Sequence, residues 1–202
     1  MAVNKQVYLI GYATEIVSLT NRLDVSLQGV IDGSRNESFC LHVPIIGDDN
    51  WFLSMPKNQN RHYIIVPQDS GRVKERIWNM YNKNGCDLLS LLAGNIDENT
   101  NIGRGAITQY GSHVSVGCQI GDLVKINYGA NVMHDCVIGN YSTIGPNAVL
   151  LGYVKVGNRV FVGANATILP GVAIGDDVVV GAGAVVTRDV GSGLTVKGVP
   201  AK

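Results

Sequence analysis

The sequence has few charged residues and no excess of either sign. Only 16% of the 202 residues are charged, and 16 lysines and arginines balance 16 aspartates and glutamates. This composition gives no electrostatic footprint for a nucleic acid or an anionic membrane. No apolar run approaches the roughly 18 residues that span a bilayer, and the first residues lack the basic and apolar regions of a secretory signal. We therefore expect a cytoplasmic protein with neither a membrane nor a nucleic acid as partner.

Cysteine and aromatic residues are also scarce. The four cysteines are dispersed and form no C-x-x-C pair, which argues against a disulfide framework and against a zinc ribbon. Aromatic residues make up 6% of the chain, whereas there are 25 glycines. Few large side chains and many glycines are typical of a repetitive β fold with tight turns. No metal site is predicted.

A repeat of six residues begins at Ile96 and continues without insertion to Val186. Every sixth residue is aliphatic except for one threonine. The positions are Ile96, Ile102, Thr108, Val114, Ile120, Ile126, Val132, Ile138, Ile144, Leu150, Val156, Val162, Ile168, Ile174, Val180 and Val186. A short, strict period of this kind indicates a β-helix built from hexapeptides.

A second period, of eighteen residues, lies on top of the first. A glycine follows the aliphatic residue at 103, 121, 139, 157 and 175. Three hexapeptides therefore make one coil of a triangular prism, with the aliphatic side chains stacked inside at a spacing of about 4.8 Å. We expect these glycines to supply the positive φ angles that sharp corners require.

The first half of the chain follows a different pattern, in which short apolar runs alternate with amphipathic segments. Strands are expected over residues 7–11, 27–32 and 62–66, and helices over 14–22 and 70–83. This alternation favours a small parallel α/β unit. Gly11 and Asp32 end two of the strands, where each either contacts a nucleotide or merely closes a turn.

Several motifs resemble one family, the nucleotide-sugar N-acetyltransferases and sialic acid O-acetyltransferases. Residues 127–139 (NYGANVMHDCVIG) are similar to its N-x-x-x-x-x-x-H-[DE]-C-x-I-G motif, and residues 198–201 (GVPA) are similar to its G-x-P-A ending. The resemblance implies a mixed α/β plus β protein. A Rossmann-like domain would occupy residues 1–90 and bind the substrate. A left-handed parallel β-helix would occupy residues 91–202, bind acetyl-CoA and assemble as a homotrimer.

The same resemblance implies a catalytic site. His134 would act as general base, with Asp135 holding the imidazole in the correct tautomer. Gly152, eighteen residues further on, would leave room for a thioester and offer its N–H to the oxyanion. The remaining candidates are Gly11, Asp32 and Asn127 for the substrate, and Thr143, Ala164, Ala182 and Lys197 for acetyl-CoA.

The leading hypothesis is N-acetylation of a nucleotide-linked amino-dideoxy sugar. The alternative is O-acetylation of a sugar hydroxyl, as on sialic acid. It is favoured by Glu15, an acidic residue in the turn where the family has a glycine-rich G-x-G-G-H sequence. A zinc enzyme of the carbonic anhydrase kind would need three histidines, and the repeat holds only His113 and His134. A trimeric scaffold without catalytic activity is the last alternative.

Overall fold

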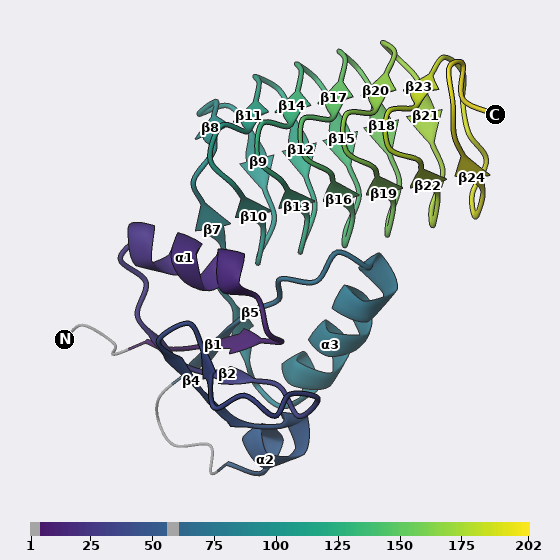
Figure 1. Ribbon diagram of the computed structural model, residues 1–202. Helices are drawn as coiled ribbons and strands as arrows, with labels where there is room; N and C mark the ends of the chain where they lie inside the picture. Colours follow the sequence, from purple (N-terminus) through teal and green to yellow (C-terminus); the bar gives the residue numbers. More distant parts are fainter. Residues whose placement is uncertain (1–4, 56–60) are drawn as a thin grey trace.

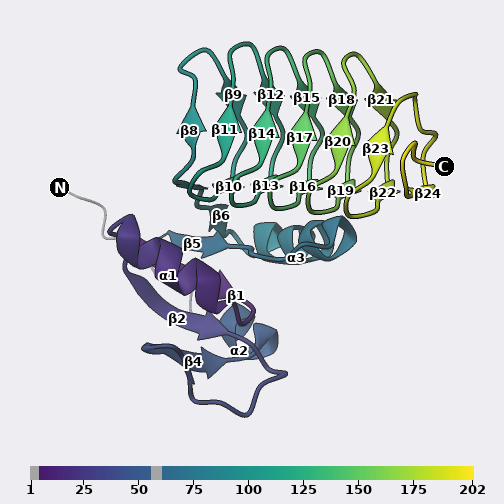
Figure 2. The same cartoon turned by 45° about the horizontal axis from the view of Figure 1, so that its top comes forward.

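The computed structural model describes residues 5–55 and 61–202. Figure 1 shows two parts: an N-terminal sheet flanked by helices, and a long prism of short stacked strands that ends at the C-terminus. Turned by 45°, Figure 2 shows that the N-terminal part lies along one side of the prism. Within the described ranges, no helix has both the length and the apolar character needed to cross a membrane.

The N-terminal part is a six-stranded sheet in the order β3-β4-β2-β1-β5-β6, parallel except for the β3–β4 pair. Its strands are β1 Gln6–Ile10, β2 Leu27–Ile31, β3 Phe39–Cys40, β4 Val43–Gly47, β5 His62–Ile65 and β6 Asp87–Leu88. Its helices are α1 Thr14–Arg22, α2 Asp49–Ser54 and α3 Gly71–Lys83. All the expected strands and helices are present, and β3, β4, β6 and α2 are additional. Because β2 and β5 lie on opposite sides of β1, the carboxyl ends of these strands border a crevice.

The C-terminal part is the predicted β-helix, in which three parallel sheets form three faces. The first face holds β7 Leu91–Leu92, β10 Ile107–Thr108, β13 Lys125–Ile126, β16 Thr143–Ile144, β19 Phe161–Val162, β22 Val179–Val180 and β24 Thr195–Val196. The second face holds β8 Asn95–Ile96, β11 His113–Val114, β14 Asn131–Val132, β17 Val149–Leu150, β20 Thr167–Ile168 and β23 Val185–Val186. The third face holds β9 Asn101–Ile102, β12 Gln119–Ile120, β15 Val137–Ile138, β18 Lys155–Val156 and β21 Ala173–Ile174.

The eighteen-residue period appears directly in the strand register. Lys125 pairs with Thr143 and Val132 pairs with Leu150, each one coil along. The aliphatic repeat from Val114 to Val186 is buried in a single core, together with small residues between its strands such as Ala130, Ala148, Cys118 and Cys136. The period shortens only at the ends, where Leu91 pairs with Ile107 and Val179 pairs with Thr195.

The expectation for the repeated glycines is wrong. Positive φ angles occur two residues later, at Gly105 but also at side-chain-bearing residues such as Tyr141 and Asn165. The repeated glycines are needed for close approach instead. A Cβ at Gly139 would lie 2.5 Å from the carbonyl carbon of Gly157 in the next coil. Contact between coils, and not turn conformation, therefore excludes a side chain at these positions.

Helix α3 attaches the N-terminal part to the first face through a buried lysine. Lys74 is fully buried, and its Nζ donates to the carbonyls of Leu123 at 2.9 Å and Ser142 at 3.0 Å and to Thr143 Oγ1 at 2.9 Å. Burial lowers the pKa of Lys74 to about 7. The negative charge of nearby Asp69 opposes this shift, and the positive charge of Lys125 adds to it. One ammonium group thus links α3 to two successive coils.

Replacing Lys74 by Met should lower the free energy of unfolding by about 2–4 kcal/mol, because three buried acceptors lose their donor. Urea denaturation measures this change. Lys83→Met, on the exposed last turn of α3, is the matched control and should stay within about 0.5 kcal/mol of the wild type. Equal stability of the two variants would contradict the assigned role of Lys74.

Candidate active site

His134 and Asp135 lie at the corner between the second and third faces, directly after β14. Asp135 has a φ of 58°, and Tyr153 one coil along has 63°, so the left-handed conformation belongs to the corner itself. The Asp135 carboxylate turns back to His134, with Oδ2 2.9 Å from Nδ1. An acceptor at Nδ1 favours the tautomer that is protonated there and leaves the Nε2 lone pair free. The His134 side chain is 45% exposed, so this lone pair is accessible.

Gly152 lies against the imidazole ring, as the eighteen-residue spacing requires. A Cβ added at Gly152 would be 2.6 Å from His134 Cε1 and 2.7 Å from Nε2. The space that we expected a thioester to enter is therefore filled by the imidazole ring itself. Tyr153 meets the same ring edge-on, with centroids 5.1 Å apart and planes at 88°. Glycine at 152 therefore lets the His134 ring approach the neighbouring coil closely.

The Gly152 amide remains available to a ligand. The amides on either side are used: Leu151 N–H donates to the Ile168 carbonyl at 3.1 Å, and Tyr153 N–H donates to the His134 carbonyl at 3.1 Å. Among residues 5–55 and 61–202, no acceptor bonds the N–H of Gly152. An unpaired amide beside an accessible imidazole can stabilise negative charge that develops next to the base.

A second candidate site lies at the carboxyl ends of the N-terminal strands. A cleft of about 680 Å³ opens there, and Gly11, Asp32, Arg35, Asp48 and Arg76 are among its lining residues. The two substrate candidates from the sequence, Gly11 and Asp32, therefore share one cavity. Two arginines in the cleft supply positive charge suited to a phosphate group.

Asp32 is held rigidly within this cleft. Its Oδ2 accepts the Tyr12 N–H at 2.9 Å, and its Oδ1 accepts the N–H and the hydroxyl of Ser34 at 2.9 and 2.6 Å. Burial on its own would raise the pKa of Asp32, but the Ser34 and Tyr12 hydrogen bonds and the charge of Arg35 outweigh it and lower the pKa. The carboxylate is therefore charged at neutral pH.

Glu15, in the first turn of α1, has a cationic partner that the sequence did not reveal. Lys125 Nζ lies 2.9 Å from Glu15 Oε1 and 3.1 Å from Asp69 Oδ1, and it donates to the Pro67 carbonyl at 3.2 Å. The lysine side chain is only 4% exposed. It occupies the outward-pointing strand position of the hexapeptide, which the N-terminal part covers. Nothing in the repeat pattern marks that position as buried.

Two of the predicted site residues have structural partners. Asn127 is buried, and its Nδ2 donates to the Ile144 carbonyl at 2.9 Å. Thr143 is fully buried, accepts from Lys74 and donates to the Asp69 carbonyl at 2.9 Å. Thr143 thus lies against α3 and its preceding loop, whereas Asn127 is bonded to the next coil of the β-helix. The roles of Asn127 in substrate binding and of Thr143 in cofactor binding stay predictions.

The remaining cofactor candidates lie on a different part of the β-helix. Ala164 and Ala182 are at the corner between the first and second faces, and Lys197 is exposed in the last coil. The second face runs from this corner to the His134 corner. The small residues and the base thus border the same face.

The two candidate sites of one chain do not meet. The N-terminal part docks on the first face, through Lys74 and Lys125, as Figures 1 and 2 show. His134 is at the corner between the other two faces, which is the prism edge opposite that docking surface. The cleft and the His134 imidazole of a single chain are therefore separated by the body of the β-helix.

Comparison with known proteins agrees with this architecture. Residues 117–152 match the family model "Bacterial transferase hexapeptide (six repeats)", and residues 153–188 match "Hexapeptide repeat of succinyl-transferase". No curated protein sequence matches the chain. Several solved structures match it over nearly its whole length.

Three of these structures come from different bacteria. PerB from Caulobacter crescentus, solved with CoA and GDP-perosamine, is 30% identical with a TM-score of 0.91, covering 98% of this chain and 96% of that one. The acetyltransferase domain of PglB from Neisseria gonorrhoeae, solved with acetyl coenzyme A, is 26% identical with a TM-score of 0.90 and 98% coverage of both chains. WeeI from Acinetobacter baumannii is 25% identical with a TM-score of 0.87, covering 98% of this chain and 99% of that one.

The Caulobacter enzyme is described as a GDP-perosamine N-acetyl transferase, and it has also been solved with one histidine replaced by Ala or by Asn. Identity at this level over almost the full length of both chains, together with the repeat and the exposed imidazole, leads to one conclusion. The chain is an acetyltransferase and belongs to the hexapeptide-repeat family of nucleotide-sugar N-acetyltransferases.

Proposed function

We propose that this protein transfers the acetyl group of acetyl-CoA to the amino group of a nucleotide-linked amino-dideoxy sugar, with His134 as general base. The observation that carries the proposal is the imidazole of His134, which is accessible, oriented by Asp135 at 2.9 Å and in close contact with Gly152. The ligands of the related structures, CoA with GDP-perosamine and acetyl coenzyme A, support the choice of both substrates.

The proposed mechanism uses three groups. His134 Nε2 takes a proton as the amine nitrogen attacks the thioester carbon, while Asp135 stabilises the imidazolium through Nδ1. The N–H of Gly152 donates to the oxyanion, an interaction worth about 3–4 kcal/mol. As the carbon–sulfur bond breaks, the thiolate of CoA leaves and takes up the proton from His134. The products are the acetamido sugar and CoA.

Each part of the chain is assigned one of the two substrates. We assign the nucleotide sugar to residues 1–90, as a Rossmann-like domain, with Arg35 and Arg76 facing the diphosphate. Residues 91–202, as a left-handed β-helix, would bind acetyl-CoA along Ala164 and Ala182, with Lys197 near its phosphates. The case for O-acetylation was the negative charge of Glu15; its ion pair with buried Lys125 offsets that charge.

A second chain is needed to bring base and substrate together. Because His134 and the cleft lie on opposite sides of one β-helix, we infer that the base of one subunit serves the cleft of another. A closed homotrimer provides such contacts with every site equivalent. The proposed assembly is thus part of the catalytic mechanism and follows from where the N-terminal part docks.

Replacing His134 by Ala should lower kcat by at least about a hundredfold, because the general base contributes roughly 10²–10⁴ in rate. Release of the CoA thiol, followed with a thiol reagent, measures turnover. His113→Ala, one coil before the base on the second face, is the control and should keep wild-type kcat. Near-normal turnover by the His134 variant with an unchanged circular dichroism spectrum would refute the assignment.

Replacing Gly152 by Ala should reduce kcat about tenfold or more without unfolding the β-helix. The added Cβ would overlap the imidazole ring, and displacing a catalytic group by about 1 Å can cost 10²-fold in rate. The KM for the nucleotide sugar should change little, since the cleft of the N-terminal part is not altered. A Gly152 variant with wild-type kcat would show that the contact with His134 is not required for catalysis.

Two inactive variants should restore activity when they assemble together. His134→Ala removes the base, and Arg76→Glu places a negative charge in the cleft. If each site combines the base of one chain with the cleft of another, an equal mixture refolded together should recover about a quarter of wild-type activity. Each variant refolded alone remains inactive. A mixed sample as inactive as its parents would place base and cleft in the same chain.

A further inference from the structure

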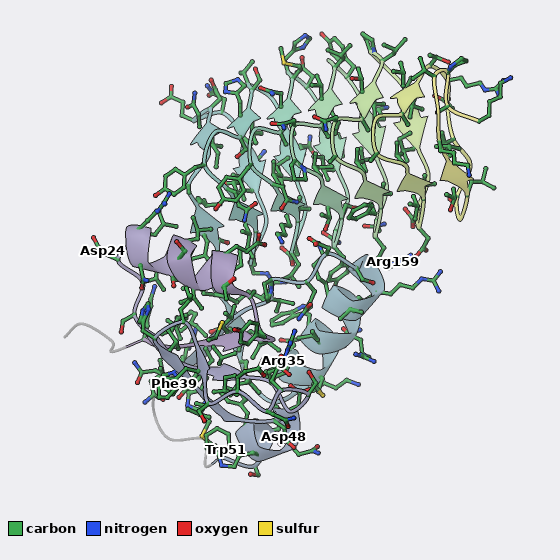
Figure 3. The ribbon with its side chains drawn as sticks, in the orientation of Figure 1. Asp24, Arg35, Phe39, Asp48, Trp51 and Arg159 are labelled. Atoms are coloured by element: carbon green, nitrogen blue, oxygen red, sulfur yellow. The ribbon has the colours of Figure 1, made fainter. Side chains whose placement is uncertain are left out.

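The nucleotide cleft continues beyond Asp48 into a second cavity. This extension measures about 560 Å³ and shares Asp32, Gly33, Arg35 and Asp48 with the main cleft. It ends at an aromatic side chain, Trp51. Figure 3 places Arg35, Asp48 and Trp51 in the N-terminal part, on the side remote from the β-helix. A ligand whose phosphates lie at Arg35 can therefore extend in this direction.

The indole of Trp51 is fixed in place although it is 43% exposed. Trp51 lies in the first turn of α2, where its backbone N–H donates to the carboxylate of the capping residue Asp48 at 2.7 Å. One side of the ring packs on Gly47: a Cβ there would lie 2.5 Å from Cε3 and 2.7 Å from Cδ2. Glycine at 47 thus allows the indole to lie against the end of β4, and this contact orients the exposed part of the ring.

The rest of the extension suits the edge of a nucleobase. Glu37 and Asp48 line it together with Ile45 and Ile46. Carboxylates accept hydrogen bonds and so match the N–H groups of a base, while the aliphatic side chains and the indole offer an apolar surface. A flat aromatic ring presented beside such groups is the arrangement that binds a base by stacking.

We propose that Trp51 is the stacking platform for the nucleobase of the nucleotide sugar, with the extension beyond Asp48 as the base subsite. This inference rests on the proposed function, because it extends the same cleft. Arg35 lines both cavities, and its guanidinium lies 4.8 Å from the centroid of the Tyr12 ring. The diphosphate then lies between Arg35 and Arg76, with the base on Trp51.

Tryptophan emission tests the proposal directly, because the chain has only two tryptophans. Trp78 is 6% exposed in the core, so stacking should quench the emission of Trp51 alone. GDP and UDP are the probes, and inorganic pyrophosphate is the ligand without a base. In the wild type, GDP or UDP should quench the emission, whereas pyrophosphate should not. In Trp51→Leu, the remaining Trp78 emission should not respond to any of the three.

Calorimetry measures affinity in the same variants. Trp51→Leu should weaken the nucleoside diphosphate that the wild type binds by about 5- to 150-fold, which corresponds to about 1–3 kcal/mol of stacking. Its affinity for pyrophosphate should not change. Trp51→Phe should recover most of the loss. Phe39→Leu, another exposed aromatic that does not line the cavity, is the matched control with wild-type affinity.

Two results would overturn the proposal in distinguishable ways. If Trp51→Leu binds GDP and UDP as tightly as the wild type, Trp51 is not the platform, and the proposed function is unaffected. If the wild type binds neither nucleoside diphosphate, the cleft is not a nucleotide site, and this part of the proposed function fails as well. A loss of affinity confined to Trp51→Leu, with normal Trp51→Phe and Phe39→Leu, supports the base subsite.

Discussion

Successive coils of the β-helix approach each other so closely that each one limits the side chains of the next. Parallel pairing at a spacing of about 4.8 Å stacks residues eighteen apart directly on one another, so a side chain at one level limits what fits at the next. Gly139 and Gly157 lack side chains because each would enter the backbone of the following coil. The same stacking places the imidazole of His134 on Gly152. The contact between His134 and Gly152, on which the proposed mechanism rests, thus follows from a rule that applies along the entire prism.

Buried lysines join the two parts of the chain. Lys74 donates to two coils from α3, and Lys125 reaches from β13 to Glu15 and Asp69. Each ammonium is removed from water at a cost that only good hydrogen-bond partners offset. Because the donors and acceptors come from both parts, the N-terminal sheet has one favourable position on the first face. That position also directs the cleft away from the base of its own chain.

Separation of base and cleft makes the assembled protein the catalytic unit under our proposal. Each chain would offer a base at one edge of its prism and a nucleotide cleft on the opposite side. Acetyl-CoA would bind along the second face, between the small residues at Ala164 and Ala182 and the base at His134. The long cofactor and the nucleotide sugar could then approach the same imidazole from different directions. Neither substrate would need to cross the surface that α3 covers.

The β-helix, its register and the alignment of His134 with Gly152 could all be predicted from the sequence. A strict period encodes these features, since every sixth residue must fill the core and every eighteenth must stack, so His134 and Gly152 could be aligned by counting. The sequence did not reveal why glycine recurs, because a turn and a close contact select the same residue. Nor did it reveal that Thr143 is buried or that Lys125 pairs with both Glu15 and Asp69. Those outcomes were decided by the tertiary structure, because they depend on which face the N-terminal part covers, and docking between distant segments leaves no period in the sequence.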